Sequence, residues 1–340
     1  MFQWIILILS LIFLLFRLSV MKEGYTDPIN AYDIIIVAGQ SNSVGYSYEA
    51  TINSADGKIP IDKITSKFTS EDLAPLPNLY ILERDPDWKL RPERITMLNK
   101  EPDYMRNCGV IPASEPMSYH STSYNAQASI GFYRTFAKNY INANPGKKVL
   151  IIHNGFEACG IFTPYLNHPS GRTDIQWNIG GALYSTLVKR VNNVLSWNPN
   201  NKVVAILWSQ GEADIDNTNV TVTQYINEFK KFITSLRTAI KNTNVPFIAC
   251  GYSQDWHTND SFTTKKNQFM SNLQSMSCTD YTGETTRTAT PRSCAIPKFA
   301  YVSTNGVTSD KATNSNNVHF NFAGLRELGQ RFWRVYSVIK

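Results

Sequence analysis

The chain has 340 residues, of which 42% are apolar, 12% aromatic and 18% charged. This composition supplies material for a globular core and excludes disorder or a collagen-like repeat for most of the chain. The 33 Lys and Arg and 27 Asp and Glu residues give a net charge of only +6 without basic blocks, so no nucleic-acid partner is expected.

The first predicted element is an apolar segment near the N-terminus. Residues 4–21 carry a single charge, that of Arg17. Their length is close to the roughly 20 residues that span a bilayer as a helix. No positively charged region precedes the segment and no small-x-small cleavage site follows it. We therefore predict a membrane anchor over residues 1–30, in preference to a cleaved signal peptide or a buried helix.

Two sequence signals disagree about the side of the membrane on which the rest of the chain lies. Arg17 and Lys22 follow the apolar run and, by the positive-inside rule, favour a cytoplasmic domain. The triplets Asn219-Val220-Thr221 and Asn259-Asp260-Ser261 are glycosylation acceptors, which favour an extracellular or lumenal domain.

Alternating strand and helix patterns follow from residue 31 to the end of the chain. Short apolar runs rich in β-branched residues predict buried parallel strands at residues 33–38, 148–153, 203–208 and 246–250. Apolar residues at three- and four-residue intervals predict helices at residues 129–141, 181–195, 222–240 and 325–338. No linker or repeat divides residues 31–340, so we predict one three-layer α/β domain. Residues 51–120 and 278–316 lack periodicity and are predicted to be long loops.

The five cysteines form no CxxC pair, so the sequence indicates neither a zinc site nor a full disulfide framework. Cys278 and Cys294 flank a Thr-rich segment and would be able to pair in an oxidising compartment. Buried or unreactive thiols are the interpretation that we favour for all of them.

A serine follows the first predicted strand directly, in the turn from Gly39 to Gly45. If a helix begins at Ser41, its free backbone N–H groups and positive dipole end would stabilise an oxyanion formed on attack by the serine. The lysine of a phosphate-binding loop and the GxGxxG spacing are both absent. Taken alone, the motif fits an ordinary helix cap as well.

Two further motifs carry groups that a serine nucleophile needs. His319 precedes the last predicted helix and is a candidate general base. The segment Gln210-Gly211-Glu212-Ala213-Asp214 follows the strand at residues 203–208, at the sheet edge where ligands bind in α/β folds. Its acidic residues lack the glycine and distal glutamate of a calcium loop, so no metal site is expected.

Together, GQSN at 39–42, QGExD at 210–214 and the histidine motif at 316–319 resemble the SGNH hydrolase superfamily, in its sialate O-acetylesterase and carbohydrate esterase family 6 branch. The resemblance implies a flavodoxin-like parallel sheet between helices, with the active site at the carboxyl ends of the strands. It implies that Ser41 forms an acyl-enzyme, usually acetyl, with His319 as general base and then general acid.

The same resemblance supplies candidates for oxyanion or substrate binding. These are the backbone N–H of Ser41 and the residues Gln40, Asn42, Gln210, Asn154 and Gly155. The last two stand where relatives have a glycine-rich block.

The chain departs from its relatives at Asn316, where most have an aspartate that orients the imidazole. An amide accepts a hydrogen bond from the ring but supplies no negative charge to the imidazolium. We therefore predict a triad of Ser41, His319 and Glu212, with Asp214 as the nearest substitute acid and Asn316 as a neutral helper.

The predicted function is removal of O-acetyl groups from sialic acid or other acetylated glycans by an extracellular or lumenal, membrane-anchored enzyme. Side chains and water complete this chemistry, so no cofactor is expected. Two alternatives remain open: a weakly active glycan-binding protein, and a lipid or thioester hydrolase of the same superfamily. Trp88, Trp177 and Trp256 are predicted to stack on sugar rings.

Overall fold

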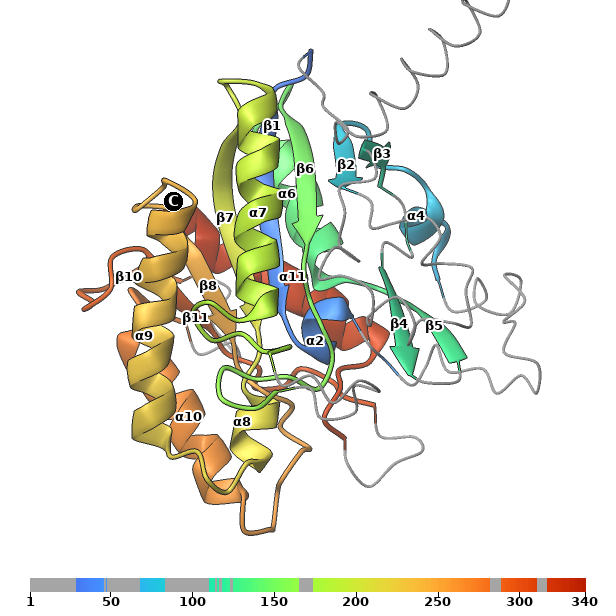
Figure 1. The fold of residues 1–340 in the computed structure, drawn as a ribbon. Coiled ribbons are helices and arrows are strands. Elements are labelled where there is room, and N and C mark those ends of the chain that lie inside the picture. The colour runs from blue at the N-terminus through green and yellow to red at the C-terminus, as the bar shows by residue number, and fades with distance from the viewer. Residues whose placement is uncertain are drawn as a thin grey trace, which may run out of the picture.

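The computed structural model describes residues 29–45, 47, 68–82, 110–113, 115, 118–122, 125–164, 174–281, 289–310 and 317–340. Within these residues a seven-stranded sheet lies between two layers of helices (Figure 1). The strand order is β11-β8-β7-β1-β6-β2-β3, and all neighbours are parallel except β3, which runs antiparallel to β2. The predicted three-layer α/β architecture is therefore confirmed.

Four strands lie where the apolar runs predict them, and three others were not predicted. The predicted ones are β1 (Tyr32–Gly39), β6 (Lys148–His153), β7 (Lys202–Ser209) and β8 (Phe247–Cys250). The others are β2 (Leu79–Leu82), β3 (Val110–Pro112) and β11 (Phe299–Val302). Two small antiparallel pairs join β4 (Ser118–Thr122) to β5 (Asn125–Ser129) and β9 (Thr279–Asp280) to β10 (Thr290–Pro291).

The helices divide between the two faces of the sheet (Figure 1). One face is covered by α7 (Ala182–Trp197), α9 (Val222–Ala239) and α10 (Thr263–Met276). The other face is covered by α6 (Phe132–Ala143) and α11 (Phe322–Ile339). Three short helices, α2 (Ser41–Val44), α4 (Ser70–Leu73) and α8 (Glu212–Asp216), interrupt the connections.

The central strand β1 shows why the sheet forms. Ile34 and Ile36 point into the core under α7 and α9, whereas Ile35 and Val37 point into the core under α6 and α11. All four side chains are fully buried. A strand buried on both faces requires a continuous apolar run, and the β-branched residues of β1 supply one.

The prediction of long loops at residues 51–120 and 278–316 is wrong in part. The described residues of these segments contain β2, β3, β4, β9, β10 and β11. The strand β11 has only four residues, and it pairs in parallel with β8 from Phe299 to Val302 with every residue buried. A run of four residues is too short to establish a period, so its place in the sheet depends on pairing with β8.

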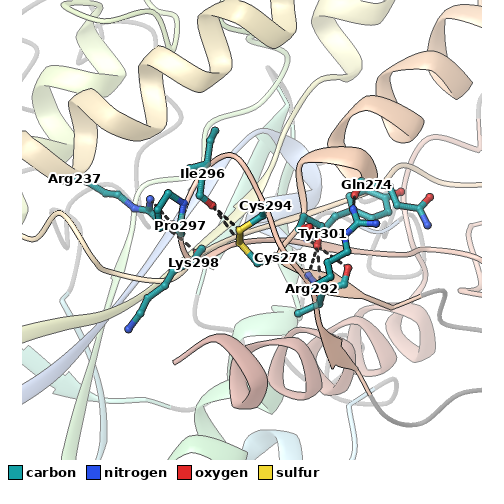
Figure 2. Close-up of a disulfide and its surroundings, with 11 residues drawn as sticks. Arg237, Gln274, Cys278, Arg292, Cys294, Ile296, Pro297, Lys298 and Tyr301 are labelled. Carbon is teal, nitrogen blue, oxygen red and sulfur yellow. Dashed lines mark hydrogen bonds between the residues drawn. A yellow bond between two sulfur atoms is a disulfide. The ribbon is translucent and has the colours of Figure 1, made fainter.

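The favoured interpretation of idle thiols is wrong for Cys278 and Cys294, which form a disulfide with a Cα–Cα distance of 4.8 Å (Figure 2). Beside it Arg237 donates to the backbone oxygens of Pro297 (2.8 Å) and Lys298 (3.0 Å), at the entry to β11. Cys159 and Cys250 are buried free thiols, and Cys108 lies outside the described residues.

The anchor predicted over residues 1–30 falls mainly on residues 1–28, which lie outside the described residues. Among the helices that the structure describes, none is both long and apolar enough to cross a membrane. The anchor therefore stays a prediction.

Candidate active site

The short helix α2 follows the carboxyl end of the central strand β1 (Figure 1). Ser41 is its first residue. The turn before it is tight, because Gly39 has a φ of +130° and the backbone N–H of Gln40 donates to the oxygen of Ser209 at 2.8 Å. A side chain at residue 39 would place its Cβ only 1.9 Å from that oxygen. The glycine thus allows β1 and β7 to meet directly beneath the serine.

The structure brings His319 against Ser41. The imidazole Nε2 lies 2.9 Å from the Ser41 Oγ and hydrogen-bonds it, although the two residues are 278 positions apart. Ser41 is 7% exposed and His319 is 8% exposed. A hydroxyl at hydrogen-bond distance from an imidazole has a base in place to take its proton, as nucleophilic attack requires.

The backbone around His319 is fixed by the segments on both sides of it. Its carbonyl oxygen accepts from the backbone N–H of Asp310 at 3.0 Å. Asn321 then caps α11, and its side chain accepts from the backbone N–H of Gly324 at 2.8 Å. His319 is therefore held at the start of α11. This helix packs against helix α6 and against strand β11 of the sheet.

Asn42, the neighbour of the serine, connects three elements. Its Nδ2 donates to Glu212 Oε1 at 2.8 Å and to the backbone oxygen of Val318 at 3.0 Å. Its Oδ1 accepts from the backbone N–H of Phe320 at 3.3 Å. The amide is 1% exposed and both of its protons are used. The residues on either side of His319 are thus hydrogen-bonded to Asn42, the residue after Ser41.

Glu212 is buried at the first position of α8. Its Oε1 accepts from Asn42, and its Oε2 has no hydrogen-bond partner among the described residues. Burial raises the pKa of the Glu212 carboxyl to about 7. The structure therefore brings Glu212 to Asn42, and its contact with the serine–histidine pair runs through that amide.

Asp214 fastens a loop beside the site. Its carboxylate accepts from the backbone N–H groups of Ile161 (2.8 Å), Phe162 (3.0 Å) and Thr163 (3.0 Å), and from Gln210 Nε2 (3.0 Å). Burial raises its pKa, and these hydrogen bonds oppose that rise. Asp214 therefore holds residues 161–163 in place, and it accepts one hydrogen bond from the side-chain NH₂ of Gln210.

The other predicted oxyanion or substrate ligands are buried and engaged in the fold. Gln40 Oε1 accepts from the backbone N–H of Ala213 at 3.2 Å, and Asn154 Nδ2 donates to the oxygen of Leu183 at 3.2 Å. Gly155 packs against α2, where a Cβ would lie 2.3 Å from Ser43 Oγ. The Ser41 N–H stands at the first helical position, which has no intrahelical acceptor, and so remains a candidate oxyanion donor. Asn316 lies outside the described residues.

Two features of the site were not predicted. Arg190, on the buried face of α7, donates to the oxygens of His153 (2.6 Å) and Leu82 (3.2 Å) and so ties together the ends of β6 and β2. Its signal in the sequence is a cation within an apolar helical stripe. The contacts of Asn42 have no such signal, because the partners are 170 or more positions away.

The prediction that Trp177 and Trp256 stack on sugar rings is wrong, because both side chains are buried. Trp177 donates from Nε1 to the oxygen of Gly39 at 3.1 Å and packs edge-on against Trp208. It therefore supports the turn before Ser41. Trp88 lies outside the described residues.

A serine and histidine at the carboxyl edge of a parallel sheet are equipped for acyl transfer. No group of three or more His, Cys, Asp or Glu side chains in the described part of the chain is arranged to hold a metal ion. The sequence from residue 31 to 337 matches the family described as carbohydrate esterase, sialic acid-specific acetylesterase. The chain belongs to this family.

Structures similar to this acetylesterase family member are known. The crystal structure of NanS superposes with a TM-score of 0.61 at 17% identity, covering 91% of this chain and 97% of NanS. The X-ray structure of a protein from Arabidopsis thaliana gives a TM-score of 0.59 at 16% identity, covering 89% of this chain and 97% of the other. At these identities the superpositions show a shared fold. The sequence matches no curated protein.

Membership in the acetylesterase family makes the chain a carboxylic ester hydrolase of the carbohydrate esterase type. The resemblance inferred from the three motifs is thereby confirmed.

Proposed function

We propose that the chain removes O-acetyl groups from carbohydrates, with sialic acids as the first substrates to test, through an acyl-enzyme formed on Ser41. One observation carries the proposal: the 2.9 Å hydrogen bond between Ser41 Oγ and His319 Nε2 at the carboxyl end of β1. Family membership over residues 31–337 supports the acetyl ester as substrate.

The reaction proceeds in two steps. Ser41 Oγ attacks the acetyl carbonyl carbon while His319 Nε2 takes the hydroxyl proton, and the resulting oxyanion accepts from the Ser41 N–H. Collapse of this intermediate expels the sugar oxygen, which receives the proton from His319. Water, deprotonated by His319, then attacks the acetyl-serine, and acetate leaves as Ser41 recovers its proton.

The deciding experiment compares acyl and sugar preference in the full chain. We expect the chain to hydrolyse p-nitrophenyl acetate much faster than esters of longer acyl chains. We also expect it to release acetate from O-acetylated sialic acid, and acetylated xylan serves as the comparison polymer. Long-chain preference would instead identify a lipid hydrolase, and sugar binding without turnover would identify a glycan-binding protein.

Ser41→Ala is the matched control, because it removes the nucleophile from a buried position with little change in volume. It should abolish turnover and labelling by a serine-directed phosphonate. If Ser41→Ala kept wild-type turnover, the nucleophile assignment would be wrong.

The proposal places the domain on the extracellular or lumenal side of a membrane, held there by the predicted anchor. Two observations support this side: the Cys278–Cys294 disulfide, a bond typical of oxidising compartments, and the exposure of Asn219 and Asn259. A glycosidase-sensitive mobility shift that disappears in the Asn219→Gln, Asn259→Gln double variant would support it. An unglycosylated, fully reduced protein in eukaryotic cells would contradict it.

A further inference from the structure

The two residues beside His319 present groups of opposite polarity to Asn42. Val318 offers a carbonyl oxygen, which accepts from Nδ2 at 3.0 Å, and Phe320 offers an N–H, which donates to Oδ1 at 3.3 Å. Both bonds exist in only one orientation of the Asn42 amide. Turned by 180°, the amide would set its oxygen against the Val318 oxygen and its NH₂ against the Phe320 N–H.

The hydrogen bond to Glu212 favours the same orientation of the Asn42 amide. The remaining Nδ2 proton of Asn42 goes to Glu212 Oε1 at 2.8 Å. The turned amide would face Glu212 Oε1 with its own oxygen, and two acceptor oxygens form no hydrogen bond. Asn42 is 1% exposed, so no solvent is at hand to compensate for a mismatched bond.

We propose that Glu212 is a positioning residue that acts through Asn42: it orients the amide that holds Val318 and Phe320, and so keeps His319 Nε2 on the Ser41 hydroxyl. This role rests on the proposed esterase function. It differs from the predicted triad role, in which Glu212 would act on the imidazole by its negative charge.

The distinction lies in what Glu212 must supply. Positioning needs one acceptor oxygen at Oε1, which a protonated carboxyl group and a glutamine amide both retain. The second oxygen, Oε2, has no hydrogen-bond partner among the described residues, so its replacement by NH₂ breaks no bond there. The rise in the Glu212 pKa that burial causes is in keeping with a role that does not need the charge.

The test is a set of variants assayed for kcat and KM on an acetyl ester. Glu212→Gln should stay within about threefold of wild type, with an unchanged pH–rate profile. Glu212→Leu and Asn42→Ala should each lose roughly 10²-fold, mainly in kcat, because displacing a catalytic group by about 1 Å costs that much. The double variant Glu212→Leu, Asn42→Ala should be no worse than Asn42→Ala alone, since both changes remove one pathway.

Asn201→Ala is the matched control. Asn201 is also a buried amide that bridges two backbone groups, accepting from the N–H of Tyr32 at 2.7 Å and donating to the oxygen of Val194 at 2.7 Å. It lies at the opposite end of β1 from Ser41, beside Tyr32, the first residue of the strand. It should lower stability and leave kcat unchanged. A loss of about 10⁴-fold in Glu212→Gln, the size expected when a triad loses its acid, would overturn the positioning role.

Amide hydrogen exchange at Phe320 tests the same inference without any substrate. Exchange should speed up in Asn42→Ala and Glu212→Leu by more than their change in global stability accounts for, whereas in Glu212→Gln and Asn201→Ala it should change only as far as global stability changes. Unchanged exchange in Asn42→Ala would overturn the role. If the wild-type protein did not hydrolyse acetyl esters, the proposed function would be wrong. The exchange rate at Phe320 would still show whether Asn42 and Glu212 hold the backbone beside His319. If Glu212→Leu does not fold, Glu212→Gln and Asn42→Ala suffice.

Discussion

Gly39 and Ser209 come together so closely that a Cβ on the glycine would lie 1.9 Å from the serine's backbone oxygen. Gly39 also has a φ of +130°, which L side chains rarely adopt. Gly39→Ala should therefore destabilise the fold by about 3 kcal/mol or more, because the ends of β1 and β7 would have to move apart. This movement would displace Ser41, which follows β1, and we expect it to abolish ester hydrolysis. Chemical denaturation measures the first effect. Gly146→Ala is the control, because Gly146 has a φ of +82° with open space around it, and about 1 kcal/mol is expected there.

Removing the charge and one acceptor of Asp214 should loosen residues 161–163. In Asp214→Asn an NH₂ group replaces one oxygen and faces N–H donors, so we expect a loss of about 2–4 kcal/mol in the free energy of unfolding and faster amide exchange at Ile161 to Thr163. Glu228→Gln, which breaks the exposed pair of Glu228 and Lys231, should cost under about 0.5 kcal/mol. Equal effects of the two changes would contradict the anchoring role of Asp214.

The raised pKa of Glu212 gives stability a defined pH dependence. Its carboxyl titrates near 4.5 in the unfolded chain and at about 7 in the folded one. Between these values the folded state binds more protons, so this group lowers the free energy of unfolding as pH rises, by about 3 kcal/mol at about 1.4 kcal/mol per unit. The free energy of unfolding of wild type and of Glu212→Gln can be measured by denaturation from pH 4.5 to 8. The variant should become more stable relative to wild type as pH rises to about 7, and the difference should then level off. If the difference in the free energy of unfolding did not change with pH, the raised pKa of Glu212 would be wrong.

The Cys278–Cys294 disulfide closes a loop with a sequence separation of 16. Its removal in Cys278→Ala, Cys294→Ala should lower the free energy of unfolding by about 3 kcal/mol, through the larger entropy of the unfolded chain. A reductant should lower the melting temperature of wild type and leave that of the double variant unchanged. Equal sensitivity of both proteins would mean that the bond does not stabilise the fold.

The sequence predicts the centre of the sheet well because β1, β6 and β7 are continuous apolar runs that solvent-exposed segments rarely show. It does not predict β11 or α10. β11 is four residues long, and the only apolar side chains that α10 buries are those of Phe269, Leu273 and Met276. Both elements depend on contacts with segments distant in the sequence: β11 pairs with β8, and α10 packs on the core of the sheet. A local sequence pattern does not show such contacts.

The candidate site divides in the same way. Ser41 and His319 are identified by motifs because each follows or precedes a recognisable element. The role of Asn42 depends on three partners from two distant segments, and its chemistry emerges only when β7 and α11 are placed beside β1. The side chains of Gln40, Asn154 and Gln210 were predicted from motifs as ligands; in the folded chain each makes a hydrogen bond within the protein, and their part in substrate binding stays a prediction.

Ser41 and His319, the proposed nucleophile and base, lie 278 residues apart in the sequence. During synthesis Ser41 emerges with the first core strand, but His319 emerges only just before α11, the last helix. A chain cut before residue 319 would therefore hold Ser41 without its proposed base, and on the proposed function we expect it not to hydrolyse esters. The proposed serine–histidine pair forms only when the segment before α11 has docked beside the carboxyl end of β1, so on the proposed function ester turnover would report that α11 is in place on the sheet.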